Sequence, residues 1–185
     1  MNKSFGLIFL SILLLLTGCD PGNVDLDNAG AERLLVTISN VPYDMPPASY
    51  KRIQLDPGFH GLIIRNAEGE VIKDTTIEVG IGGLLNVANS NYIIWRDLYG
   101  NPELKATLLD EQTIEVGEQV FVGDFTSIPT NQVYVEQVWD YCLNDDFGEL
   151  ITAWEPNKDE RYRVKSKLYR EQDFVTDYMK LATPK

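Results

Sequence analysis

The residue types that most often carry out chemistry in proteins are scarce in this chain. Its 185 residues include one histidine and two cysteines, so most histidine-based catalytic and metal-binding schemes are excluded. His60 follows a tight turn, between Phe59 and Gly61, and we interpret it as a structural strand residue rather than a general base. No Gly-x-Ser-x-Gly nucleophile motif is present. The sequence therefore predicts no catalytic residue and no enzyme activity.

Acidic side chains give the candidate metal ligands. Calcium is bound by about six to eight oxygen atoms, but the acids here lack the spacing of an EF-hand loop. The candidate set is Asn144, Asp145, Asp146 and Glu149. Because such side chains more often bond the local backbone in a turn, we expect a turn here, with no metal and no cofactor.

Cys19 is the residue whose surroundings point most directly to a chemical modification. Lys3 gives the chain a positive start, and an apolar run follows from Phe5 to Leu16. The run is shorter than the about 20 residues that span a bilayer, and it is typical of a secretory signal peptide. It ends in Leu16-Thr17-Gly18-Cys19, which resembles the lipobox of bacterial lipoproteins.

The lipobox resemblance implies a processing pathway. In that family a peptidase cuts before the cysteine, whose sulfur carries a diacylglycerol and whose new amine is usually acylated, palmitate being the typical chain. Residues 1–18 would be the signal peptide, and the lipid on Cys19 would hold the protein at the inner or outer membrane of the bacterial cell envelope. The alternative is a plain signal peptide or membrane anchor with an incidental cysteine. With the lipid on Cys19, we expect Cys142 to be a buried thiol.

Charge is distributed unevenly along the chain. A hydrophobic content of 44% and a formal charge of −12 are ordinary for a globular protein, and the acidic excess argues against nucleic-acid binding. Removing Lys3 with the leader makes the charge −13. Between Ala106 and Asn157 there are eleven acids and no lysine, arginine or histidine, whereas Lys158 to Lys185 has eight basic residues against five acids.

Two interpretations of the acidic stretch stay open. We favour a solvated acidic face that the basic final strand complements. The alternative is a docking surface for a basic envelope protein, which would raise the association rate and weaken with salt. The candidate docking residues are Asp110, Glu111, Glu115, Glu118, Glu136, Asp140, Asp145, Asp146 and Glu149.

Aromatic residues form a second group of candidates. Rings exposed on one sheet face would stack on sugars, which makes a glycan-binding module the alternative function. Alternating aromatics in strands more often pack in the core or pair across strands, and we favour that interpretation. The residues considered for stacking are Tyr92, Trp95, Tyr99 and Trp139.

The pattern of elements predicts a mainly β fold. Residues 19–32 are polar and predict a flexible tether, and residues 33–185 predict a single β-rich domain. Three prolines between Val41 and Ala48 exclude a helix and a central strand. The strand candidates, separated by turn signals, are 33–39, 50–55, 59–65, 71–79, 92–95, 104–109, 112–116, 119–122, 132–138 and 161–168.

The C-terminus predicts a helix that packs on the sheet. Residues 171–181 place apolar side chains on one helical stripe and acids opposite. The stripe consists of Phe174, Val175, Tyr178 and Met179.

Residues 34–79 carry a second resemblance. A strand, a proline-rich link and a strand leading into Leu-x-Pro-Gly-x-His resemble PEGA-type and transthyretin-like β-sandwich domains of bacterial envelope proteins. The matching residues are Leu55, Pro57, Gly58, His60 and Gly69. The resemblance implies an antiparallel β-sandwich with a surface or scaffold role and no catalytic residues. Together these observations predict a lipid-anchored envelope protein with a structural or protein-interaction role.

Overall fold

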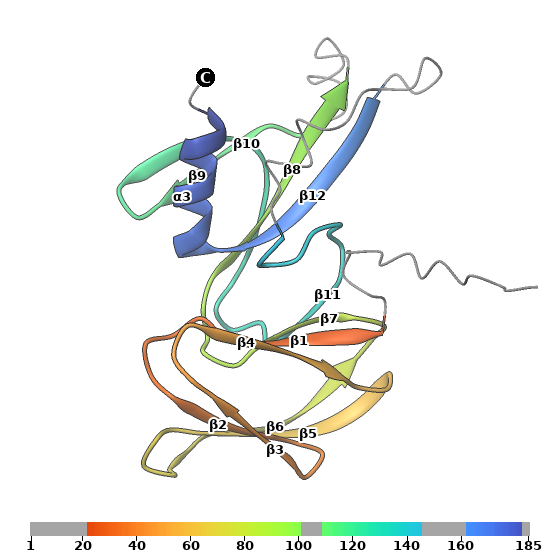
Figure 1. Ribbon diagram of the computed structural model, residues 1–185, viewed down its shortest axis with the longest axis vertical. Helices are drawn as coiled ribbons and strands as arrows, with labels where there is room; N and C mark the ends of the chain where they lie inside the picture. Colours follow the sequence, from red (N-terminus) through yellow and green to blue (C-terminus); the bar gives the residue numbers. More distant parts are fainter. Residues whose placement is uncertain (1–21, 101–108, 146–161, 183–185) are drawn as a thin grey trace, which may run out of the picture.

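The computed structural model describes residues 22–100, 109–145 and 162–182. Within these ranges the chain forms twelve β-strands and one α-helix (Figure 1). The strands make three four-stranded sheets, so the predicted mainly β, sandwich-like fold is confirmed. No helix in these ranges is long and apolar enough to cross a bilayer.

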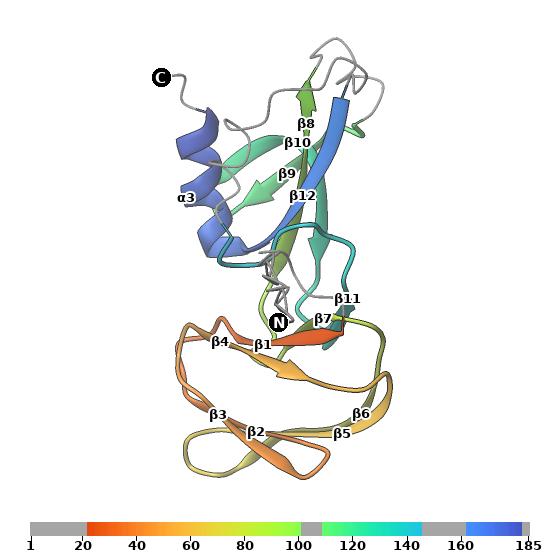
Figure 2. The same ribbon diagram turned by 45° about the vertical axis from the view of Figure 1, so that its right-hand side comes forward.

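Two of the sheets face each other as a β-sandwich. Sheet A, in spatial order, consists of β11 (Tyr134–Glu136), β7 (Gly83–Asn86), β1 (Asn23–Asn28) and β4 (Ser49–Gln54). Sheet B consists of β3 (Val41–Met45), β2 (Leu34–Ile38), β5 (Gly58–Arg65) and β6 (Val71–Val79). Figures 1 and 2 show the two sheets as the lower half of the molecule. The proline-containing strand β3 lies at a sheet edge, because Pro42 has no N–H for a second neighbour.

The core of the sandwich comes from strands that alternate apolar and polar residues. Apolar side chains of sheet A point toward sheet B and are almost fully excluded from solvent. The principal core residues are Val24, Leu26, Leu34, Val36, Ile38, Met45, Leu62, Ile64, Val79 and Leu85. Burial of these side chains supplies the main stabilisation of the sandwich.

The predicted tether is wrong from Asn23 onward. Residues 23–28 form β1, which pairs antiparallel with β4 and parallel with β7, and is therefore a central strand. Val24 and Leu26 face the sandwich core, whereas Asp25 and Asp27 face the opposite side of sheet A. The segment can be buried despite its polar composition, because its acids are paired with arginines inside the protein. Residues 19–21 lie outside the described residues.

Sheet C and the helix make the upper half of the molecule (Figure 1). In spatial order the sheet consists of β12 (Tyr162–Arg170), β8 (Tyr92–Gly100), β10 (Gln119–Ile128) and β9 (Gln112–Val116). The helix α3 spans Glu171–Ala182, so the predicted C-terminal helix is confirmed. The strand expected at 104–109 lies outside the described residues except for Leu109.

Both faces of sheet C are covered by apolar side chains. Toward α3, an aromatic cluster surrounds Phe174, which is fully buried and contacts Trp95, Phe121, Phe125, Tyr169 and Tyr178. Toward the sandwich, a separate cluster contains Leu84, Tyr92, Ile94, Ile128, Val135, Trp139, Leu143 and Leu168. Because this second cluster includes residues of β7 and β11, it joins sheet C to sheet A.

Candidate interaction surface

The junction between sheet A and sheet C contains a buried ionic group. Asp27 of β1 is completely buried, and its carboxylate accepts hydrogen bonds from Arg170 Nε at 3.1 and 3.2 Å and from Arg170 Nη2. The hydroxyl of Tyr92 donates to the same carboxylate at 2.6 Å. Burial alone lowers the pKa of Arg170, but its hydrogen bonds to Asp27 and the charges of Asp27 and Asp173 together raise it. The guanidinium therefore stays charged.

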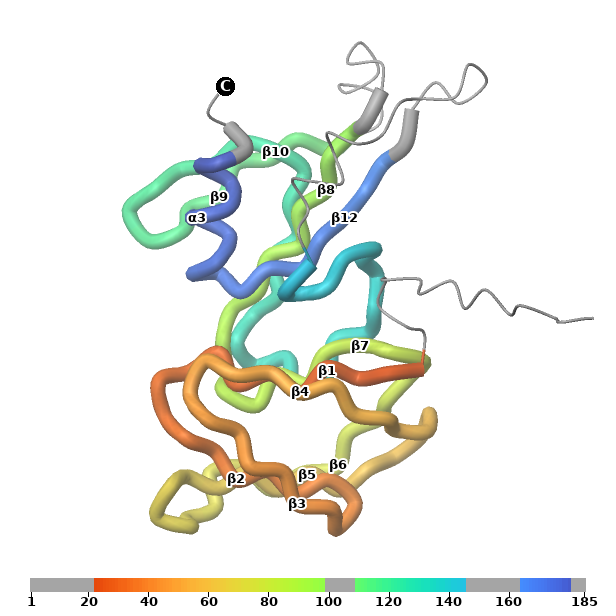
Figure 3. The backbone as a smooth tube through the Cα atoms, in the orientation of Figure 1, coloured from red at the N-terminus to blue at the C-terminus, as the bar shows by residue number. Residues whose placement is uncertain are grey.

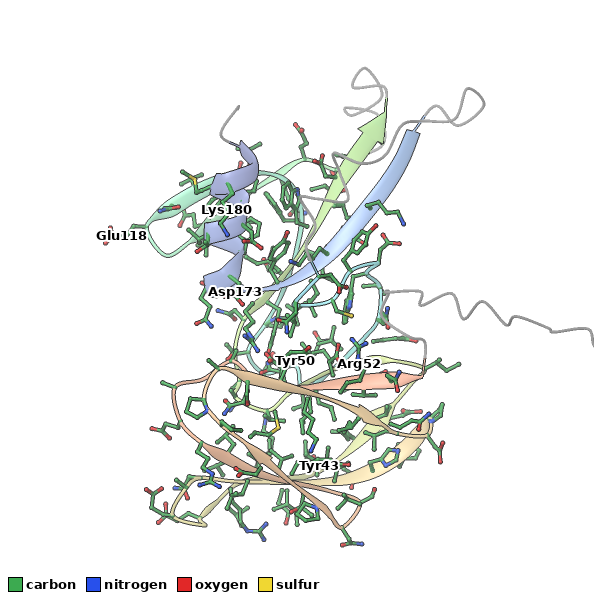
Figure 4. The ribbon with its side chains drawn as sticks, in the orientation of Figure 1. Tyr43, Tyr50, Arg52, Glu118, Asp173 and Lys180 are labelled. Carbon is green, nitrogen blue, oxygen red and sulfur yellow. The ribbon has the colours of Figure 1, made fainter. Side chains whose placement is uncertain are left out.

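A second ion pair lies on the same side of sheet A. Arg52 Nε donates to Asp25 Oδ1 at 2.9 Å, and Arg52 Nη2 lies 3.4 Å from Cys142 Sγ. The hydrogen bond to Asp25 raises the pKa of Arg52. Figure 4 shows Arg52 on the side of the sandwich that faces sheet C. Asp25 thus links β1 to β4 within sheet A, and Asp27 links β1 to Arg170 at the end of β12.

Cys142 is buried, with 6% of its surface exposed, but it is disulfide-bonded rather than a thiol. The expected burial of Cys142 is confirmed, whereas the disulfide differs from the thiol that a lipid on Cys19 would leave there. The sequence has one other cysteine, Cys19, which lies outside the described residues. A sulfur atom bound to a diacylglycerol cannot also belong to a disulfide, so the two chemistries exclude each other at Cys19.

The candidate sugar-stacking aromatics are buried. Tyr92 is 0%, Trp95 8% and Trp139 5% exposed, and each lies in one of the two apolar clusters on sheet C. The packing interpretation is confirmed for these three residues, and an exposed stacking platform built from them is contradicted. Tyr99 lies on β8, but its side chain is outside the described part of the chain.

The structure divides the acidic stretch into two groups. Glu136, Asp140 and Asp145 lie on β11 and the segment that follows it, at the junction below β12 (Figure 1). The other group lies on or beside the hairpin of β9 and β10 and consists of Asp110, Glu111, Glu115 and Glu118. Asp146 and Glu149 lie outside the described residues. The seven candidate residues that the structure describes therefore do not form one continuous surface.

The junction group bonds largely within the protein. Asp140 accepts hydrogen bonds from the backbone N–H of Ser166 at 2.9 Å and from Lys165 Nζ at 3.4 Å. Asp145 accepts the backbone N–H of Cys142 at 2.7 Å, which confirms the expected local turn. Since Ser166 and Lys165 belong to β12, the complementation by the basic final strand holds for Asp140.

The hairpin group faces solvent. Asp110, Glu111, Glu115 and Glu118 are all exposed, and none forms an ion pair with another described residue. Gly117 makes the hairpin turn with a φ of 61°, and Figure 4 shows Glu118 at the outer end of the hairpin. We call residues 110–123 the acidic hairpin.

Apolar side chains are exposed on the same hairpin. Phe121 and Val116 point toward α3 and are buried, whereas Val120 and Val122 point away and are 63% and 57% exposed. Val120 lies directly across from Glu115 in the β9–β10 register. The outer face of the acidic hairpin therefore combines exposed valines with unneutralised carboxylates.

A cleft lies beneath the tip of the acidic hairpin. It consists of two adjoining hollows of about 450 and about 460 Å³, which share Asn91, Val116 and Glu171. Its walls come from the hairpin, the start of α3 and the loop between β7 and β8. Figure 3 shows the hairpin beside α3, and the backbone N–H of Glu171 donates to the backbone oxygen of Asn91 in that loop at 3.2 Å. We call this space the hairpin cleft.

His60 has a structural environment. It lies on β5, where one ring nitrogen bonds Ser39 Oγ at 2.9 Å and the other bonds the backbone oxygen of Asp56 at 2.7 Å. The first contact reaches the turn between β2 and β3, and the second holds the turn before β5. Across residues 22–100, 109–145 and 162–182, no three histidine, cysteine, aspartate or glutamate side chains converge as metal ligands would.

Sequence reasoning missed the residues that build the junction. Asp25 and Asp27 alternate with Val24 and Leu26, and this period of two was the available signal for a strand. Their partners lie 27 and 143 residues away, which no local pattern indicates. Comparison of the chain with protein-family models, with curated proteins and with solved structures finds no match.

Proposed function

We propose that the protein is a lipid-anchored component of the bacterial cell envelope that binds another protein and performs no catalysis. The anchor rests on the lipobox-like residues Leu16 to Cys19 behind a short apolar run, and it requires Cys142 to be a thiol in the lipidated protein, because the sulfur of Cys19 would carry the diacylglycerol. The similarity of residues 34–79 to PEGA-type envelope domains belongs to the same proposal and favours a scaffold role.

The acidic hairpin is the observation that carries the binding role. Four exposed carboxylates without an ionic partner among the described residues lie beside Val120 and Val122, which are more than half exposed. The carboxylates would steer a basic partner toward this surface. Val120 and Val122 would then supply affinity, because the docked partner covers them.

The remainder of the fold holds the hairpin in a fixed position. Phe121 anchors its inner face in the aromatic cluster, and the Asp27–Arg170 pair ties sheet C to the sandwich. A rigid presentation lowers the entropy that binding would otherwise lose. A sugar platform is not proposed, because Tyr92, Trp95 and Trp139 are buried.

A capture experiment from detergent-solubilised envelope tests the binding role. The hairpin variant carries Asp110→Asn, Glu111→Gln, Glu115→Gln and Glu118→Gln. The control removes four exposed sandwich charges through Glu32→Gln, Glu68→Gln, Asp74→Asn and Glu78→Gln. We expect wild type and control to retain a basic protein at low salt and the hairpin variant to lose it. Equal capture by both variants, or none by wild type, would refute the proposal.

A further inference from the structure

The hairpin cleft has a lining that combines three kinds of group. Val116, Ile128, Pro129 and Val175 supply apolar surface. Asn89, Asn91, Thr130 and Gln172 supply hydrogen-bond donors and acceptors. Glu115 and Glu171 supply carboxylates, from β9 and from the first residue of α3. Such a lining suits a ligand that is partly aliphatic, partly amide-like and positively charged.

The charges around the cleft do not cancel. Arg170 is one of the lining residues, but its guanidinium is bonded to Asp27, and its Nη1 lies 3.7 Å from Asp173 Oδ2. Neither Glu115 nor Glu171 forms an ion pair with a described residue. Figure 4 shows Asp173 near the start of α3. The cleft therefore has an excess of negative charge.

We infer that the hairpin cleft binds a lysine or arginine side chain carried by an extended segment of the partner protein. The aliphatic stem of such a side chain packs against Val116 and Val175 while its charged head meets Glu115 and Glu171. The side-chain amide of Asn91 bonds a peptide group beside it, whereas that of Asn89 already accepts a hydrogen bond from Lys73 Nζ at 2.8 Å.

A second copy of this chain is disfavoured as the occupant. Each chain carries a formal charge of −12, so two copies repel each other at long range. A basic foreign segment has the opposite sign. This inference rests on the proposed binding role, for which it supplies the site and the chemistry of the partner.

Peptide binding to the detergent-solubilised full-length protein tests the inference. The probe is a fluorescent peptide of alternating lysine and valine, and its matched control replaces lysine with glutamate. The variants are Glu115→Gln with Glu171→Gln, against Glu68→Gln with Glu78→Gln on the sandwich. We expect fluorescence anisotropy to show a Kd about tenfold higher for Glu115→Gln with Glu171→Gln, which is about threefold for each carboxylate removed. The Kd of the sandwich variant should be unchanged. Unchanged thermal unfolding midpoints establish that the variants fold.

The other outcomes separate the failures. Equal peptide affinity in the two variants would overturn the cleft as the site, while capture that still depends on the acidic hairpin would leave the proposed function standing. Loss of hairpin-dependent capture would refute the proposed function itself. Free spermidine provides the same cationic chemistry without peptide groups. Two results together would overturn a peptide as the occupant. Spermidine would bind with the same Kd as the peptide, and Asn91→Ala would leave the Kd of the peptide unchanged.

Discussion

Asp27 and Arg170 lie 143 residues apart in the chain and form a two-pronged contact at the junction of the sandwich and sheet C. The side chain of Asp27 is 0% exposed and that of Arg170 is 9% exposed. The contact joins the first described strand to the last one. Because both charges have lost most of their water, each depends on the other for compensation.

Removing one partner of this pair should be costly. We expect Arg170→Met to lower the free energy of unfolding by about 3–5 kcal/mol, because it leaves the carboxylate of Asp27 buried with Tyr92 as its remaining donor. Adding Asp27→Asn should restore part of the loss by removing the buried charge. Urea unfolding measures both effects.

The exposed pair of Arg33 and Asp44 provides the control for that prediction. Its side chains are 57% and 50% exposed, so water screens their attraction, and Arg33→Met should change stability little. An equal loss of unfolding free energy in Arg33→Met and Arg170→Met would show that the contribution of the Asp27–Arg170 pair to stability does not depend on its burial.

Tyr92 should make the protein sensitive to high pH. Burial, and then the charge and hydrogen bond of Asp27, raise the pKa of Tyr92 above its ordinary value of 10.0. The unfolded chain loses this proton near pH 10 while the folded chain keeps it, so the stabilisation is complete below pH 10 and declines as the pH rises.

The expected decline is up to about 1.4 kcal/mol per pH unit above pH 10. Tyr92→Phe should lack this contribution, whereas Tyr50→Phe, on the exposed part of β4, should retain it. Urea unfolding between about pH 9 and about pH 11 gives the slopes. Identical slopes in the two variants would contradict the account.

The attachment of α3 should depend on one ring. Phe174 is 0% exposed and contacts five aromatic residues, so Phe174→Ala should lower the free energy of unfolding by about 3–5 kcal/mol. Thr176→Ala, on the exposed side of the same helix, should stay within about 0.5 kcal/mol of wild type. A loss below about 1 kcal/mol for Phe174→Ala would show that α3 is held by other contacts.

The sequence was sufficient for elements with strong periodicity. The alternation in residues 71–79 and the apolar stripe of α3 predicted β6 and the helix correctly, because each is decided by local pattern. The prolines correctly kept residues 41–45 off the centre of a sheet. Burial of Trp95 and Trp139 followed the same logic, since strand aromatics usually pack inside.

Long-range pairing could not be derived in this way. The sequence did not predict β1, because Asp25 and Asp27 make its composition polar. Both acids are in fact buried, and they form ion pairs with arginines of β4 and β12. The acids form one stretch in the sequence, but strand pairing places Glu118 at a hairpin tip and Asp140 beside β12. The hairpin cleft combines residues from distant parts of the chain, so no local pattern indicated it.

Mass spectrometry of the N-terminal peptide from membrane-extracted protein tests the anchor most directly. We expect a chain that begins at Cys19, with a diacylglycerol on its sulfur and an acyl group on its amine. A chain that begins elsewhere, or a Cys19 linked by a disulfide to Cys142, would contradict it.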